Sequence, residues 1–83
     1  MELTSIKSEI VTFLKNNILA EGIQISSNTI LRDIGIDSYS IVEIVLFIER
    51  QYGFVVPDSY LKPENFESVD SISTIVHNYL EKN

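Results

Sequence analysis

Hydrophobic residues recur at spacings of three and four in three separate stretches of this chain, the spacing typical of one buried helix face. The first stretch predicts a helix over about residues 4–19, with Thr4 as its N-cap. Gly22 lies just past the predicted end, where glycine commonly follows a helix. The apolar positions of this face are Leu3, Ile6, Ile10, Phe13, Leu14 and Ile18.

The second and third stretches predict two further helices. One covers about residues 38–52 and ends at Gly53. The other begins near residue 69, with Ser68 or Asp70 as its N-cap. The core-facing positions of the middle helix are Ile41, Ile44, Val45, Ile48 and Tyr52. Those of the last helix are Val69, Ile72, Ile75, Val76, Tyr79 and Leu80.

Two connections join these helices. The first, residues 21–35, is too apolar for a solvated loop, so we expect it to pack across the helices. The second, residues 54–68, carries two prolines and several turn residues, which leave room for one short helical turn. A strand at "FVV" would lack a partner. The pattern therefore predicts a single all-α domain over residues 1–83, a small three-to-four-helix bundle with a long first connection and a short third helix.

The middle helix has more apolar residues than its core face requires. At 100° per residue, Tyr39, Val42 and Leu46 form a second stripe beside that face. Negative charge borders this stripe at Asp37, Glu43 and Glu49. The stripe could pack under the 21–35 connection. An exposed apolar patch rimmed with charge more often marks a partner site, so we predict a docking surface.

Charge and composition narrow the classes of function. The net charge is −6, from 12 acidic and 6 basic residues, which disfavours nucleic acid as a partner. The chain has no cysteine, so disulfides and thiolate metal sites are not expected, and a cytoplasmic location fits. Charged residues interrupt the apolar N-terminal stretch, and no apolar run approaches membrane-spanning length. Neither a secretory signal nor a membrane anchor is therefore expected.

Ser38 stands at the predicted start of the middle helix, but it lacks the surroundings of a catalytic nucleophile. Such a serine needs a base, usually histidine, and an orienting acid. The single histidine, His77, falls in the last helix, where a partly exposed surface position is expected. The local string "GIDSYS" also lacks the G-x-S-x-G elbow. No catalytic residue is predicted, and taken alone Ser38 would be an N-cap.

The string "LRDIGIDSYSIVEIVLFIERQYGFVVPD" resembles the acyl and peptidyl carrier protein family, whose pattern is Leu-x-Asp-Leu-Gly-x-Asp-Ser-Leu, then a helix, an aromatic residue and a proline. The matching positions at its start are Leu31, Asp33, Ile34, Gly35, Asp37 and Ser38. Those that follow are Glu43, Ile48, Glu49, Tyr52, Phe54 and Pro57. The first predicted helix and the closing "SVDSISTIVHNYL" also fit, so the resemblance spans nearly the whole chain.

The resemblance implies that Ser38 carries 4′-phosphopantetheine, attached from coenzyme A by a phosphopantetheinyl transferase. Asp37 would help to dock that enzyme and position its metal. The arm would hold acyl or aminoacyl intermediates as thioesters, and the protein itself would be a monomeric, non-catalytic carrier. Partners would include an acyl or aminoacyl ligase, a ketosynthase or other pathway enzymes. They would read the middle helix through Tyr39, Val42, Glu43, Leu46 and Glu49.

Some positions depart from the family pattern. Tyr39 replaces the leucine that usually follows the modified serine, and Arg50 stands where fatty-acid carriers tend to be acidic. The stretch "YLKPENFESVDSIS" is longer than its counterpart in those carriers. These differences favour a discrete carrier of a dedicated biosynthetic pathway, with a fatty-acid-like, polyketide or aminoacyl cargo. The alternative is an unmodified helical interaction module that uses the same surface.

The aromatic residues allow two interpretations. Phe47, Phe54, Tyr60 and Phe66 could line a space that shelters a cargo between the helices. Packing in the core is preferred, because a bundle this small needs every large side chain to close it.

Overall fold

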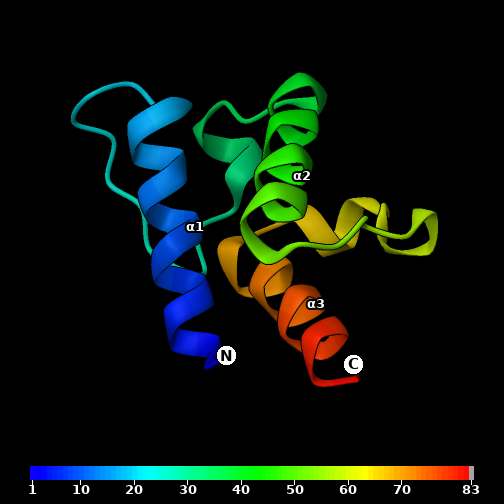
Figure 1. Ribbon diagram of the computed structural model, residues 1–83. Coiled ribbons are helices and arrows are strands. Elements are labelled where there is room, and N and C mark those ends of the chain that lie inside the picture. Colours follow the sequence, from blue (N-terminus) through cyan, green and yellow to red (C-terminus); the bar gives the residue numbers. More distant parts are fainter. Residues whose placement is uncertain (83) are drawn as a thin grey trace.

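The computed structural model describes residues 1–82, which form three α-helices and three short 3-10 helices (Figure 1). The α-helices are α1 (Leu3–Asn17), α2 (Ser38–Tyr52) and α3 (Val69–Lys82). The 3-10 helices are η1 (Leu31–Ile34), η2 (Asp58–Tyr60) and η3 (Pro63–Phe66). These residues contain no strand, so the all-α prediction is confirmed. None of their helices is long and apolar enough to cross a membrane.

The predicted short third helix is replaced by two separate 3-10 helices, η2 and η3. Pro57 precedes η2, and Pro63 is the first residue of η3. Proline has no N–H to donate and clashes with the preceding turn, so one α-helix cannot run through both positions. This segment extends to one side of the three long helices (Figure 1).

The core lies where the three long helices meet, and the predicted helix faces supply most of it. Its fully buried apolar residues are Ile6, Ile10, Leu14, Leu31, Ile44, Ile48, Val69, Ile72 and Val76. A hydrogen bond of 2.7 Å from the Tyr52 hydroxyl to Glu9 Oε1 also joins α2 to α1. Burial and this bond to Glu9 raise the pKa of Tyr52, so the phenol stays protonated and continues to donate.

The connection from residue 18 to 37 packs against the helices, as its hydrophobicity predicts. Leu31 is fully buried and Ile25, Ile30 and Ile34 are half-buried, although Ile23 is exposed. Backbone hydrogen bonds tie this connection to the start of α3, from Leu31 N–H to the Glu67 carbonyl (2.9 Å) and from Asp70 N–H to the Ser27 carbonyl (2.8 Å).

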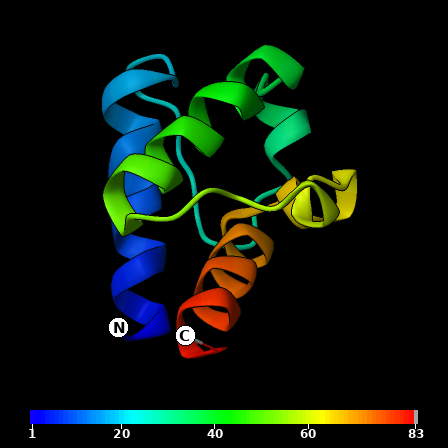
Figure 2. The same ribbon diagram turned by 45° about the vertical axis from the view of Figure 1, so that its right-hand side comes forward.

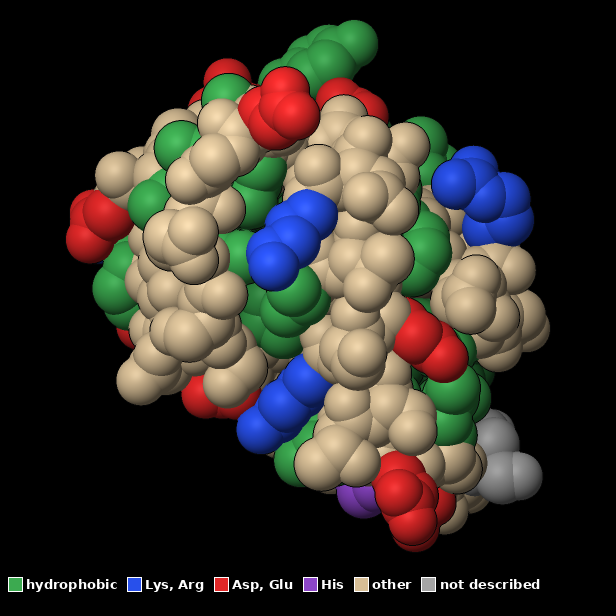
Figure 3. Space-filling model, turned by 90° about the vertical axis from the view of Figure 1, so that its left-hand side faces the viewer, with side chains coloured by type: hydrophobic (Ala, Val, Ile, Leu, Met, Phe, Trp, Pro, Cys, Tyr) green, Lys and Arg blue, Asp and Glu red, His purple; other side chains and the backbone are tan. Residues whose placement is uncertain are grey.

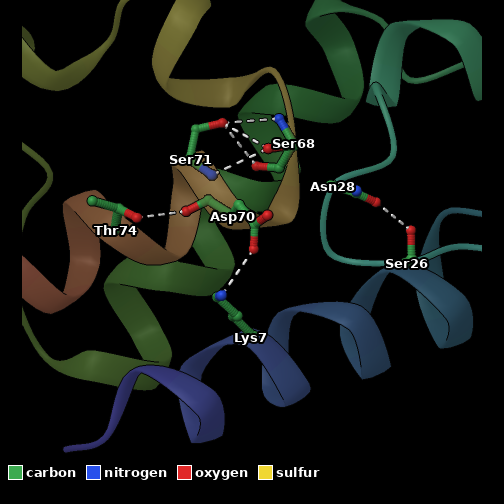
Figure 4. A network of polar contacts seen from close by, with 7 residues as sticks. All are labelled: Lys7, Ser26, Asn28, Ser68, Asp70, Ser71 and Thr74. Atoms are coloured by element: carbon green, nitrogen blue, oxygen red, sulfur yellow. Dashed lines mark hydrogen bonds and ion pairs between the residues drawn. The ribbon is translucent and has the colours of Figure 1, made fainter.

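An ion pair extends this attachment to α1. Lys7 Nζ lies 2.9 Å from Asp70 Oδ1, joining α1 to the first turn of α3 (Figure 4). The hydrogen bond from Lys7 lowers the pKa of Asp70, and one from Ser27 lowers it further. Because the pair is partly exposed, solvent screens it and its contribution to stability is small.

The predicted helix caps are partly confirmed. Thr4 lies inside α1, and Glu2 is the N-cap without a side-chain hydrogen bond, so the Thr4 prediction is wrong. Ser68 precedes α3, and its Oγ accepts a hydrogen bond from Ser71 N–H (3.2 Å). The Ser71 Oγ accepts one from Ser68 N–H (3.0 Å) in return, as Figure 4 shows. This reciprocal pair decides between the two candidates in favour of Ser68.

Ser73 is buried in α3 with no hydrogen-bond partner for its hydroxyl among residues 1–82. An unsatisfied buried hydroxyl costs about 1–3 kcal/mol, and alanine is also the better helix former. Ser73→Ala is therefore expected to raise the free energy of unfolding by about 1 kcal/mol in urea titrations. The control is Ser5→Ala, at an exposed position of α1, which changes helix propensity alone. A lower stability of the Ser73 variant would contradict the prediction.

Candidate functional site

The N-terminus of α2 is built around Asp37. Asp37 is the N-cap, and its Oδ1 accepts a hydrogen bond of 3.0 Å from Ser40 N–H. The interpretation of Ser38 as a simple cap is therefore wrong. Ser38 is the first residue of the helix, is exposed to solvent, and has no side-chain hydrogen bond among residues 1–82. Its hydroxyl is thus presented on a rigid element without a structural role of its own.

Gly35 turns the chain from η1 toward this helix start. It has a φ of 94° and ends η1, with its N–H 3.3 Å from the Arg32 carbonyl. An added Cβ would meet nothing within 4 Å, so the left-handed conformation, and not a close contact, is what favours glycine here.

The hydrogen bond from Ser40 N–H lowers the pKa of Asp37 below its usual 3.8. Because the pKa of Asp37 is lower in the folded protein than in the unfolded chain, its ionised carboxylate stabilises the fold. This stabilisation is complete above the pKa of the unfolded chain and is lost as the pH falls through the pKa of the folded protein. Asparagine also caps helices well but does not titrate. Thermal unfolding followed by circular dichroism between about pH 5 and pH 2 should therefore show a shallower decline for Asp37→Asn than for the wild type. Equal declines would contradict this assignment.

A groove of about 680 Å³ opens beside Ser38. One wall comes from η1 and the start of α2, and the other from η3 and the residues before it. Its lining combines apolar and charged side chains: Ile30, Leu31, Arg32, Ile36, Asp37, Ser38, Ile41, Leu61, Lys62, Pro63, Glu64, Phe66 and Glu67. Sequence reasoning missed this groove, because its two walls lie at least 20 residues apart in the chain and share no motif.

The second stripe of α2 is open to solvent. Tyr39, Val42 and Leu46 are 76%, 57% and 53% exposed. They do not pack under the first connection, so that alternative is wrong. Glu43 is exposed beside them. The predicted patch of apolar side chains with an acidic neighbour therefore exists on the folded surface.

Glu49 differs from the other predicted surface residues. It is half-buried, and its Oε2 accepts a hydrogen bond of 2.9 Å from Val56 N–H. This bond holds the segment after α2 against the helix. The carboxylate therefore has a structural role that the sequence pattern did not indicate.

The four aromatic residues considered as a cargo lining are packed. Phe47 stacks on Phe13 with ring centroids 4.3 Å apart, and Phe54 stacks on Tyr79 at 4.1 Å. Tyr60 meets Tyr79 edge to face at 6.1 Å. Phe66 is buried and forms part of the groove wall. The core-packing interpretation is confirmed.

Other kinds of site find no support in the described residues. His77 is half-buried on α3, as predicted, and residues 1–82 contain no group of three or more potential ligands that could hold a metal ion. On the face that includes α1, acidic and basic side chains are scattered, without a continuous basic surface (Figure 3). An exposed serine on the first turn of α2, beside an open groove, remains as the candidate site.

Comparison with known families defines the class of protein. Residues 6–76 match the PP-binding family, described as "Phosphopantetheine attachment site". This match covers most of the chain, and the protein therefore belongs to this family of carrier proteins, whose prosthetic group is 4′-phosphopantetheine. The resemblance stated from the sequence is thus confirmed.

Individual relatives are carriers as well. The chain is 29% identical over 82 residues to Aminoacyl carrier protein 1 of Bradyrhizobium diazoefficiens, covering 94% of this chain and 89% of the relative. It is 33% identical over 67 residues to an acyl carrier protein of Campylobacter hominis, covering 81% of this chain and 80% of that one.

Two solved structures share the fold. Both are of Bradyrhizobium japonicum glycine:[carrier protein] ligase. In the complex with glycylated carrier protein, the matching chain has a TM-score of 0.69 and 29% identity, with 88% of this chain and 96% of that chain covered. The complex with cognate carrier protein and an analogue of glycyl adenylate gives a TM-score of 0.71 and 29% identity, covering 92% and 96%.

Proposed function

We propose that this protein carries an aminoacyl group as a thioester on a 4′-phosphopantetheine arm attached to Ser38. The observation that supports this most strongly is the free, exposed hydroxyl of Ser38 on the first turn of α2. Asp37 performs the capping, so Ser38 can be modified without loss of a hydrogen bond that the fold needs.

The surroundings of Ser38 fit the proposed attachment. In the transfer, Ser38 Oγ bonds to the phosphorus, the nucleotide half of coenzyme A leaves, and the hydroxyl proton passes to a base of the transferase. Because the transferase supplies the base, Ser38 needs to be accessible and does not need a base of this protein beside it. This agrees with the absence of a side-chain hydrogen bond at Ser38 among residues 1–82. Asp37 stands next to it with an ionised carboxylate, and we propose that it helps the transferase to position its metal ion. Once attached, the arm supplies a terminal thiol for thioester formation.

The nature of the cargo follows from two arguments. Phe47 and Phe54 stack on other aromatic rings and Phe66 is buried in the core, which argues against a long acyl chain sheltered among these side chains, so a short cargo is favoured. The similar carrier proteins include aminoacyl carriers and one that is glycylated in complex with its ligase. We therefore propose an ATP-dependent aminoacyl ligase as the loading partner.

The alternative, an unmodified interaction module, would use the same α2 surface without any chemistry at Ser38. Intact-mass spectrometry separates the two. After incubation with coenzyme A and a broad-specificity phosphopantetheinyl transferase, a carrier gains the mass of one arm. The holo protein, given ATP, an amino acid and an aminoacyl ligase, should then gain one aminoacyl group. No gain under conditions that modify a control carrier would favour the module.

Glu43 is proposed to steer the loading enzyme toward the α2 patch. Acidic side chains at the edge of an interface mainly raise the association rate with basic partners. Glu43→Lys is expected to slow loading about 10-fold at low salt, with a smaller effect at high salt. The thermal midpoint should stay unchanged because Glu43 is exposed. The control is Glu81→Lys at the end of α3, and equal loading rates for all three proteins would contradict the proposed role.

A further inference from the structure

The groove beside Ser38 has a defined construction. The backbone hydrogen bond from Leu31 N–H to the Glu67 carbonyl holds η1 against the end of η3, so the two walls meet at a fixed place. Figure 2 shows η1 below the start of α2, with the η2–η3 segment beside it. Ile36, Ile41 and Phe66 give the groove an apolar lining. Its volume falls within the range of roughly 300–1,000 Å³ typical of small-molecule sites.

Two cations line this groove in an acidic protein. Arg32 lies on η1 in one wall, and Lys62 precedes η3 in the other. They are two of only 6 basic residues in a chain with a net charge of −6. Both are exposed, and within residues 1–82 neither forms an ion pair, in contrast to Lys7. Two uncommitted positive charges therefore lie on either side of the groove at which Ser38 stands.

We propose that this groove holds the phosphopantetheine arm along the protein, with Arg32 and Lys62 binding its phosphodiester. This inference rests on the proposed modification of Ser38. A phosphodiester remains negatively charged throughout the physiological pH range and complements these cations, and the apolar wall suits the hydrocarbon parts of the arm. Because Ser38 is itself a lining residue, attachment makes the contact intramolecular, so weak interactions suffice to populate it.

Acidic side chains at the groove would act on the end of the arm that holds the cargo. Three carboxylates also line the groove, those of Asp37, Glu64 and Glu67, all exposed and outside any ion pair among the described residues. They would repel the phosphodiester but attract the ammonium group of an aminoacyl cargo. Because the phosphodiester is bonded to Ser38 Oγ, only the distal end of the arm, with the ammonium group of an aminoacyl cargo, is free to approach Glu64 and Glu67.

The test compares amide chemical shifts of the ¹⁵N-labelled apo and holo proteins. If the arm lies in the groove, attachment should shift the amides of Leu61, Lys62 and Glu64, which are remote from Ser38 in sequence. Arg32→Gln combined with Lys62→Gln should reduce those remote shift changes by at least half. Lys15→Gln, an exposed lysine of α1, is the matched control and should leave them as in the wild type.

The outcomes are distinguishable from failure of the proposed function. A mass gain of one arm accompanied by shift changes only at residues 37–39 would overturn this inference and leave the carrier function standing. Remote shifts that persist unchanged in the double variant would overturn the roles of Arg32 and Lys62. If the double variant is unfolded, the two single variants answer the same question. A lack of mass gain would overturn the proposed modification itself.

Discussion

Ser38→Ala is expected to gain no mass when incubated with coenzyme A and a phosphopantetheinyl transferase, whereas the wild type gains one arm. The reason is chemical, since alanine has no oxygen to bond to phosphorus. The variant should fold normally because Asp37, and not Ser38, caps α2. Its thermal midpoint should stay close to that of the wild type, as is usual for exposed substitutions, which change stability by about 0.5 kcal/mol or less.

Ser40→Ala provides the matched control. Ser40 lies two residues further along the same helix, and alanine retains the backbone N–H that it donates to Asp37. It should therefore be modified as the wild type is. Modification of Ser38→Ala would show that another side chain accepts the arm. Failure of both variants together with a normal wild type would indicate that the transferase requires the local surface and would leave the attachment point to be mapped by peptide mass spectrometry.

Ile44→Ala and Val42→Ala are expected to separate the two apolar stripes of α2. Ile44 is fully buried, and its truncation should lower the free energy of unfolding by about 2–5 kcal/mol. For a domain of this size that loss approaches the whole stability, so substantial unfolding at 37 °C is expected. Val42 is 57% exposed, and its truncation should change stability by less than about 0.5 kcal/mol.

The kinetics of loading by the ligase should respond to substitutions in the exposed stripe, although these substitutions leave the stability unchanged. Val42→Ala removes part of the proposed docking patch and should raise the KM of the loading ligase for the carrier while urea unfolding stays unchanged. Leu46→Ala, at the neighbouring exposed position, should behave similarly. A large loss of stability in Val42→Ala would show that this stripe belongs to the core. Unchanged loading kinetics in both variants would contradict the assignment of the patch to a partner.

Local pattern was sufficient for the helices and their ends. The 3.6-residue period predicted α2 with both boundaries, since Gly53 adopts the left-handed conformation that stops a helix there, with a φ of 74°. The prolines predicted that residues 54–68 could not form a long helix, but not that two 3-10 turns would result. Thr4 was mistaken for a cap because a residue type favoured at caps is also tolerated inside a first turn.

Some features of the candidate site could likewise be predicted from the sequence, and others could not. The motif around Ser38 and the exposed stripe of Tyr39, Val42 and Leu46 were predictable, because the motif is contiguous in the sequence and the stripe lies on one helix. The hydrogen bond of Glu49 to Val56 N–H was not, since it depends on how the chain folds back after α2.

The family, the candidate serine and the helix that presents it could be predicted from the sequence, because a contiguous motif and a regular period need no knowledge of distant contacts. That Asp37 caps α2 and leaves the Ser38 hydroxyl free is evident only from the tertiary structure. Only it placed Arg32 and Lys62 on opposite walls of a groove beside that hydroxyl. Those arrangements arise from the packing of η1 and η3, which is set by a shared core and by a backbone hydrogen bond between segments far apart in the chain.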